Sequence, residues 1–259
     1  MAITLKSKKE IEKMRVSGRI VKQIHEHITE ICKPGVTVRE LDEEVGRLVR
    51  EADAFNIFRF YPTYRPGEGF PSHACISVNE VVVHGTASDQ VIKDGDIVSL
   101  DCGVSIDGWC GDAATTILVG NVAPEVRELC ETTEHILHLA ISEMKPGRRW
   151  SQIARLMQQY AENKGYGVVR DFVGHGIGRQ MHEDPKVPNY VSRDLIRNDI
   201  VLREGLVLAV EPMCNLGTRE VKTLDDGWTV VTLDGKPSAH YEHTIAMTSK
   251  GAMPLTDGS

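Results

Sequence analysis

Four carboxylates and one imidazole stand at positions in the sequence where together they can bind metal ions: Asp101, Asp112, His175, Glu211 and Glu242. Asp101 directly follows the apolar run 97–100, and Glu211 directly follows the apolar run 206–210. A carboxylate at the end of a buried strand is unfavourable unless a partner neutralises its charge. Each residue alone is typical of a solvated surface or of a structural histidine. The five together predict a metal cluster.

A predicted hairpin brings the first two carboxylates together. Asp107-Gly108 is a typical hairpin turn, so the segments on either side are expected to pair as antiparallel strands. If the loop centres between Ile106 and Asp107, Asp101 faces Asp112 with Cβ atoms about 4.5–5.5 Å apart. Two like charges there destabilise a sheet unless a cation lies between them or one carboxyl is protonated. Paired metal ions in hydrolases sit about 3.5–4 Å apart, a spacing that carboxylates bridge.

The other ligands come from the second half of the chain. Glu242 alternates with Thr244 and Ala246 along a predicted strand, so the three side chains share one face. His175 lies in Gly-His-Gly-Ile-Gly, where the glycines allow backbone and imidazole to approach a ligand closely.

The elements that position these residues form an internal repeat. KPGVTVREL at 33–41 recurs as KPGRRWSQI at 145–153, and KDGDIVSLD at 93–101 recurs as REGLVLAVE at 203–211. Amphipathic patterns predict helices over 8–31, 38–53, 124–144 and 150–164. Short β-branched runs predict strands between them. We therefore expect an α+β fold in which two related halves pack about a pseudo-twofold axis around a shared central site.

Composition sets the class of protein. With 259 residues, 41% hydrophobic and 26% charged, and no linker, the chain is expected to form a single catalytic domain over 1–259, with halves of roughly 1–120 and 121–259. A net charge of −7 without a Lys/Arg block argues against DNA binding. No apolar segment is long enough for a signal peptide or a membrane span. Six scattered cysteines without a C-x-x-C pair favour reduced thiols and a cytoplasmic location.

Five segments resemble the successive signatures of the methionine aminopeptidases of metallopeptidase family M24: CISVNEVVVHG, LDCGVSIDGWCGDAATT, GHGIGRQMHEDP, VEPM and YEHTI. Only 35 residues separate His175 from Glu211, as in the short bacterial type I form. The resemblance implies the pita-bread fold, a curved antiparallel sheet backed by two pairs of helices. It also implies two divalent ions per chain (Co²⁺, Mn²⁺, Fe²⁺ or Zn²⁺), whose identity the ligand types leave open. The implied activity is removal of the initiator methionine from nascent polypeptides with a small second residue, by a monomer with transient ribosome contact.

The same resemblance assigns individual roles. Asp101 would chelate one ion, Asp112 and Glu242 would bridge both, and His175 with Glu211 would complete the other site. A metal-bridging hydroxide would attack the scissile carbonyl while Glu211 moves the proton. The remaining catalytic groups are two histidines: His84 would face the scissile amide nitrogen and His182 the carbonyl oxygen.

The methionine pocket implied by the family contains aromatic and sulfur side chains, here Cys75, Trp228, Phe70 and Tyr64. This chain departs from the family pattern in a longer 59–72 stretch, in Phe70 where tyrosine is common, and in Met181 where phenylalanine is common. Backbone carbonyls near Asn79, Val81 and Ser238 match a monovalent-cation site.

Two alternatives remain open at this point. The aminopeptidase P and prolidase group shares the five-ligand pattern, although its members usually carry a large additional domain. A catalytically inactive relative could keep the fold as a binding module. Cleavage of Xaa-Pro peptides would favour the first alternative, and absence of bound metal would favour the second.

Overall fold

Four long helices carry the frame of the protein. The computed structural model describes residues 3–62 and 69–258. The helices lie where the sequence predicts them: α1 (Lys8–Ile31), α2 (Val38–Glu51), α3 (Pro124–Glu143) and α4 (Trp150–Asn163). Capping boxes at Ser7 and Thr37 fix the starts of α1 and α2, because each hydroxyl accepts a hydrogen bond from the N3 backbone and the N3 glutamate bonds back to the cap. A five-residue helix, α5 (Arg193–Arg197), was not predicted.

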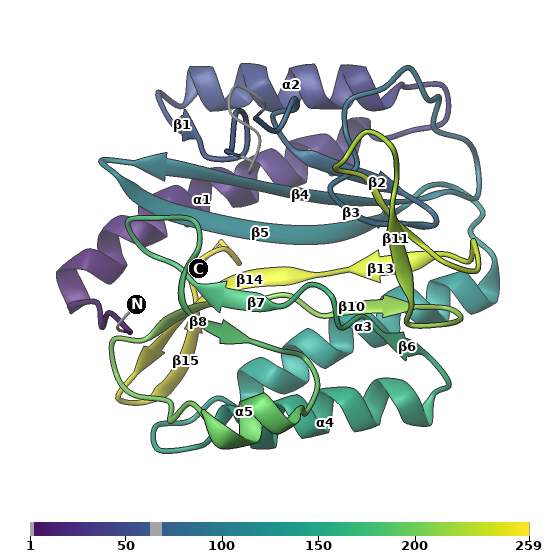
Figure 1. The fold of residues 1–259 in the computed structure, drawn as a ribbon. Helices are drawn as coiled ribbons and strands as arrows, with labels where there is room; N and C mark the ends of the chain where they lie inside the picture. Colours follow the sequence, from purple (N-terminus) through teal and green to yellow (C-terminus); the bar gives the residue numbers. More distant parts are fainter. Residues whose placement is uncertain (1–2, 63–68, 259) are drawn as a thin grey trace.

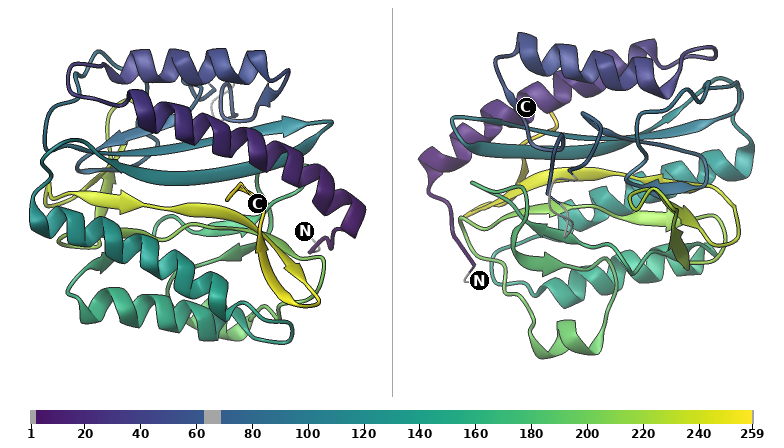
Figure 2. Two further views of the ribbon diagram at one scale, coloured as in Figure 1. Left: turned by 180° about the vertical axis from the view of Figure 1, so that it is seen from behind. Right: turned by 45° about the horizontal axis from the view of Figure 1, so that its top comes forward.

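The helices cover one face of an antiparallel sheet. Its strands follow the order β1-β4-β5-β14-β9-β7-β8, with β2 paired to β4 and β15 paired to β14. The strands are β1 (Phe55–Asn56), β2 (Cys75–Val78), β4 (Ile97–Ile106), β5 (Trp109–Leu118), β7 (Gly174–Gly176), β8 (Glu183–Val187), β9 (Val207–Val210), β14 (Glu242–Thr248) and β15 (Gly251–Pro254). Figure 1 shows the α1/α2 pair at the top and the α3/α4 pair at the bottom of the molecule, and the left view of Figure 2, seen from behind, shows α1 and α3 lying in front of the strands, on the same face of the sheet.

Two smaller sheets complete the structure, in the orders β13-β10-β6 and β11-β12-β3. Their strands are β3 (Val81–Val83), β6 (Gly167–Val168), β10 (Met213–Asn215), β11 (Val221–Thr223), β12 (Val230–Thr232) and β13 (Ser238–His240). The α+β class and the antiparallel sheet backed by two helix pairs are confirmed.

Matching backbone hydrogen bonds recur in the two halves. The Gly35 N–H donates to Ile92 O at 2.9 Å, and the repeat-related Gly147 N–H donates to Leu202 O at 2.8 Å. Gly35 and Gly147 have φ of 100° and 84°, a region that favours glycine and explains the repeated Lys-Pro-Gly turn. The halves meet where β5 pairs with β14.

The predicted register of the β4–β5 hairpin was wrong by two residues. Ile106 pairs with Trp109, so the turn is Asp107-Gly108 itself, and Asp101 lies opposite Ala114 while Asp112 lies opposite Gly103. Both turn residues have positive φ (51° and 71°), as the tight two-residue hairpin loop requires. Because the shift is even, both carboxylates still face the same side of the sheet.

Burial of alternate residues explains why the acidic side chains point away from the helices. Leu100, Cys102 and Ala113 are buried in the apolar cluster beneath α1 and α2. Side chains alternate along a strand, so Asp101 and Asp112, which neighbour them, project to the opposite face. The sheet thus separates an apolar core on one side from a polar site on the other.

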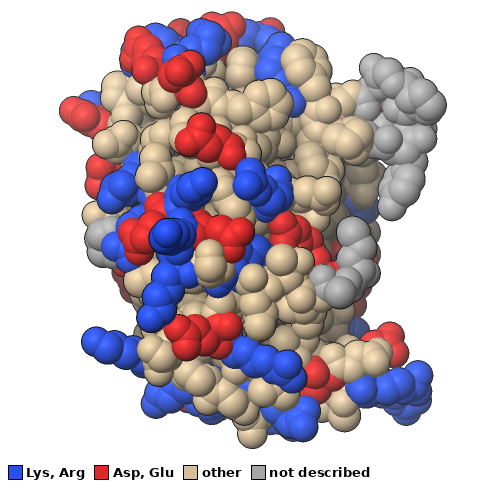
Figure 3. All heavy atoms as spheres, turned by 90° about the vertical axis from the view of Figure 1, so that its left-hand side faces the viewer, with Lys and Arg blue, Asp and Glu red and all other residues tan. Residues whose placement is uncertain are grey.

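The molecular surface is mixed in charge, and the thiols are unpaired. Acidic and basic side chains are interspersed on the face shown in Figure 3. All six cysteines are buried and free, as their spacing predicted. Among the residues described, no helix has both the length and the apolarity to span a membrane.

Candidate metal centre and substrate cavity

Neighbouring strands place the predicted ligands on one surface. Ala114 on β5 pairs with Asp101 on β4 and also with Glu242 on β14, so the two carboxylates flank one small residue. His175 on β7 and Thr244 on β14 both pair with Ala209 on β9. A row of small side chains therefore leaves room for the carboxylates and the imidazole between them.

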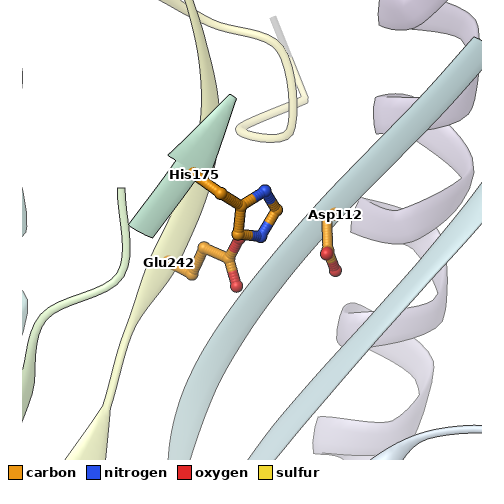
Figure 4. Close-up of side chains that lie close together, drawn as sticks. All are labelled: Asp112, His175 and Glu242. Carbon is orange, nitrogen blue, oxygen red and sulfur yellow. The ribbon is translucent and has the colours of Figure 1, made fainter. Parts of the chain in front are cut away.

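The donor atoms converge. One ligand atom each from Asp112, His175 and Glu242 lies within 4.8 Å of the other two, and within residues 3–62 and 69–258 this is the one such group of three or more His, Cys, Asp or Glu residues. Figure 4 shows the His175 ring and the Glu242 carboxylate close together, with Asp112 beside them on the neighbouring strand. His175 Nε2 lies 3.6 Å from Glu211 Oε1. Asp101 is near enough to Asp112 and Glu211 for their charges to raise its pKa.

Burial and mutual repulsion raise the pKa of all four carboxyls. Burial raises the pKa of Asp112 to about 7, and burial together with the Asp112 charge raises the pKa of Glu211 to about 8. The pKa values of Asp101 and Glu242 lie well above the ordinary values for the same reasons. Without a cation, the cluster must therefore hold protons near neutral pH.

His175 presents a free nitrogen to the carboxylates. Burial lowers its pKa to about 3, so the ring is neutral at pH 7. Its Nδ1 lies 2.9 Å from the carbonyl oxygen of Gly176, an arrangement in which Nδ1–H donates and Nε2 keeps its lone pair. A histidine that ligates a metal usually has its other nitrogen fixed by such a bond.

Buried carboxylate oxygens without a hydrogen-bond partner show whether the site fits a metal ion. One carboxylate oxygen each of Asp101, Asp112 and Glu242 is buried without a hydrogen-bond partner. A buried polar atom is normally paired, and a place for a bound ion is a recognised reason for an exception. Four carboxylates with one imidazole suit divalent ions such as Mn²⁺, Fe²⁺, Co²⁺ and Zn²⁺. The residues present therefore fit a divalent-metal site.

The ligands form one wall of a cavity of about 220 Å³. Most of the substrate residues predicted from the sequence line it as well: His84, His182, Cys75, Phe70 and Trp228. Phe70 and Trp228 pack edge to face with ring centroids 5.1 Å apart. Cys75 pairs with Asp101 across β2 and β4, which places this aromatic pocket next to the carboxylates. Tyr64 lies outside the described residues.

His84 has an unusual backbone conformation. Its φ is 59°, a left-handed value that is uncommon for a residue with a side chain and that clusters at functional sites. Burial lowers the pKa of its imidazole to about 4, so the ring is neutral at pH 7.

The sequence interpretation missed two cavity residues with polar side chains, His240 and Tyr61. His240 lies in the cavity with its Nε2 3.9 Å from Glu211 Oε2. It stands two residues before Glu242, and the alternation that located Glu242 could have located it. Tyr61 also lines the cavity, but it belongs to the irregular segment between β1 and β2, where no periodicity predicts orientation.

The residues of the predicted monovalent-cation site lie at a junction of loops. The Asn79 carbonyl accepts a 2.9 Å hydrogen bond from the Ser238 N–H, and Asn79 has a φ of 54°. Val81 opens β3 and pairs with Val231. These contacts bring Asn79 and Ser238 together, and the cation itself stays a prediction.

Several known proteins resemble this chain over nearly its whole length. The model of metallopeptidase family M24 matches residues 12–249. Methionine aminopeptidase 1 of Bacillus subtilis is 44% identical over 98% of this chain and 99% of its own length, and the methionine aminopeptidase of Clostridium perfringens is 45% identical over 98% of both. The crystal structure of methionine aminopeptidase from Thermotoga maritima superposes with a TM-score of 0.92 at 39% identity, covering 98% of this chain and 99% of that one.

The fold and the carboxylate-rich site define the class of protein: the chain belongs to metallopeptidase family M24. Within that family, the relatives that it matches over nearly their full length are methionine aminopeptidases. Prolidase from Pyrococcus furiosus shares the fold with a TM-score of 0.77 at 24% identity, and this chain covers only 66% of it. The full-length likeness therefore favours the first of these two groups.

Proposed function

We propose that this protein removes the N-terminal methionine from polypeptides with two divalent metal ions, held by Asp101, Asp112, His175, Glu211 and Glu242. The observation that carries the proposal is the convergence of these groups beside an aromatic pocket in one cavity. In this proposal Asp101, Asp112 and Glu242 would hold one ion, and Asp112, Glu242, His175 and Glu211 would hold the other. The bound ions would supply an activated hydroxide and Lewis-acid stabilisation of the scissile carbonyl.

The protein's own groups handle protons and orientation. Glu211 is suited to move a proton because its carboxylate lies within the cluster, with Oε1 3.6 Å from His175 Nε2, beside the place where the ions would bind. His182 would donate a hydrogen bond to the carbonyl oxygen as negative charge develops there. His84 would bind the scissile amide nitrogen.

The cavity favours a methionine side chain. Phe70, Trp228, Met181 and Cys75 supply apolar and polarizable surface, which suits a thioether. The 820 Å³ of empty space around this pocket includes the opening to solvent, through which the rest of a peptide would extend. We infer that the second residue of the substrate must be small.

The cellular setting is part of the proposal. We place the enzyme in the cytoplasm as a monomer acting on nascent chains, with transient ribosome contact. Six free, buried thiols support a reducing compartment. The Asn79, Val81 and Ser238 carbonyls are proposed to bind a monovalent cation.

The decisive experiment is peptide cleavage by apo protein reconstituted separately with Mn²⁺, Fe²⁺, Co²⁺ and Zn²⁺. Metal-dependent release of methionine from Met-Gly-Met-Met, with no cleavage of peptides that begin with Leu or Xaa-Pro, is the expected result. Cleavage of Xaa-Pro peptides would assign the proline-directed specificity instead. No cleavage with any metal would favour the binding-module alternative.

Two variants test the roles of individual residues. Glu211→Gln and His182→Ala should each lower kcat by about a hundredfold or more. Unchanged turnover in either variant would refute the role given to that residue.

A further inference from the structure

Tyr61 makes a direct hydrogen bond to the histidine that faces the scissile carbonyl. Its hydroxyl oxygen lies 2.7 Å from His182 Nδ1. The two rings also meet edge to face, with centroids 5.2 Å apart. On its other side the His182 ring packs against His175, with centroids 4.3 Å apart. The His182 imidazole is therefore held between a tyrosine and a proposed metal ligand.

The backbone of Tyr61 is fixed on both sides. Its N–H donates to Phe58 O at 2.8 Å, and its carbonyl accepts from the Phe70 N–H at 3.0 Å. The preceding residue, Phe60, has a φ of 64°, a conformation that a side-chain-bearing residue keeps only when its surroundings enforce it. Asn56 Oδ1 accepts hydrogen bonds from the N–H groups of Phe58 and Arg59, which fixes the entry to this segment. The hydroxyl is thus presented to His182 from an ordered turn.

The position of the hydrogen on the His182 ring makes this contact important. A neutral histidine carries one N–H, on either Nδ1 or Nε2. If Nδ1 carries the hydrogen, Nε2 is an acceptor and repels a carbonyl oxygen. If Nδ1 accepts a hydrogen bond from the tyrosine O–H, Nε2 carries the hydrogen and is able to donate it.

We infer that Tyr61 is a positioning residue: its hydroxyl donates to His182 Nδ1, selects the tautomer with a hydrogen on Nε2, and thereby aims that N–H at the scissile carbonyl oxygen. The inference rests on the proposed function, in which His182 stabilises the developing oxyanion. It assigns Tyr61, in the irregular segment before β2, a role in transition-state stabilisation. The wrong tautomer at a catalytic histidine is costly in other hydrolases.

Tyr61→Phe is the direct test, because it removes the hydroxyl and keeps the ring that packs on His182. The matched control is Tyr190→Phe, which removes a hydroxyl that donates to the Arg170 carbonyl at 3.0 Å and does not line the cavity. We expect Tyr61→Phe to lower kcat about tenfold with KM within about twofold, since a transition-state interaction is weakened and ground-state binding is not. Tyr190→Phe should leave both constants unchanged.

A double-mutant cycle separates positioning from a general structural effect. In a His182→Ala background, Tyr61→Phe should cost less than about twofold, because the group on which it acts is gone. An undiminished tenfold loss in that background would overturn the inference, and so would wild-type kcat in Tyr61→Phe.

A measurement that does not use activity distinguishes this inference from the proposed function. In ¹⁵N-labelled protein, the ring-nitrogen shifts of His182, assigned by their loss in His182→Ala, should report a hydrogen on Nε2 in the wild type and a mixture of tautomers in Tyr61→Phe. A wild-type spectrum with the hydrogen on Nδ1 would overturn the inference even if the enzyme cleaves methionine. An inactive enzyme with the expected spectrum would contradict the proposed function alone.

Discussion

Removing the metal ions should make the stability of this protein fall as the pH rises above 6.5. In the unfolded chain Asp112 and Glu211 ionise at ordinary values, whereas in the folded apo protein their pKa values are raised to about 7 and about 8. Between the unfolded and the folded pKa of each carboxyl, the folded state binds more protons than the unfolded state. The free energy of unfolding therefore decreases as the pH rises. Each such proton changes it by about 1.4 kcal/mol per pH unit. For these two groups the loss from pH 6.5 to pH 8 amounts to about 2 kcal/mol.

The pH window is chosen because the buried histidines act in the opposite direction below it. Burial lowers the pKa of His175 and His240 to about 3, so these rings stay neutral when folded and take up protons when unfolded below about pH 6.5. Their contribution is lost as the pH falls. In the unfolded chain the histidines are still about half protonated at pH 6.5 and become neutral by about pH 7.5, so their recovery offsets part of the carboxyl loss in the lower half of the window. Above about pH 7.5 both states hold the histidines neutral, and only the loss remains.

Urea unfolding of chelator-treated, dialysed protein at pH 6.5, 7.2 and 8.0 measures this slope. Metal-loaded protein should not lose stability across this pH range, because the carboxyl ligands are then ionised and metal binding favours the folded state. Glu211→Gln should flatten the apo slope by removing one titrating group. An apo stability that stays level or rises across this window would refute the assignment of protons to the cluster.

Three further predictions follow from packing around the site. Gly103→Ala should weaken metal binding about 10- to 100-fold in a calorimetric titration, because the new Cβ would lie 2.9 Å from Asp112 Oδ1; Gly35→Ala, whose Cβ would meet nothing within 4 Å, should cost about 1 kcal/mol of stability and no metal affinity. Thr244→Val should destabilise the protein by about 2–3 kcal/mol in denaturant unfolding, since the Thr244 hydroxyl accepts from the Asp112 N–H at 3.0 Å and donates to its carbonyl at 2.7 Å, and Thr244→Ser should restore most of that loss. Trp228→Ala should raise KM for Met-Gly-Met-Met about tenfold or more by removing one wall of the pocket, and an unchanged KM would show that the methionine side chain binds elsewhere.

The helices and the clustering of the acidic side chains were predictable from the sequence because each has a local signature. Capping residues and Lys-Pro-Gly turns mark the helix ends, and alternation in apolar strands marks which acidic residues leave the core. The correct hairpin register follows only if Asp107 and Gly108 form the whole two-residue turn. The Asp-Gly pair favours that turn, but the prediction placed the centre of the loop one residue too early.

The short strands and the position of Tyr61 depend on contacts between residues far apart in the sequence, which local patterns do not predict. The short strands of the two smaller sheets have three or fewer residues each and form only because tertiary packing brings partners to them. Tyr61 belongs to an aperiodic segment, and no spacing rule predicts that it faces the cavity. The hydrogen bond from Tyr61 to His182 joins residues 121 positions apart and is visible only in the folded protein.

The meeting of β5 and β14 has a consequence for the order of events during folding. Asp112 and Glu242 are brought together by one of the strand pairs that join the halves, so neither half contains all the groups of the cluster. Contacts between residues so distant in sequence form slowly, because the loop between them must close first. Each half is able to build its helix pair and its own hairpin earlier from nearer contacts. Recovery of metal binding after dilution from denaturant should therefore lag behind recovery of the helical circular dichroism signal. The rate at which metal binding recovers would then measure how fast the two halves dock.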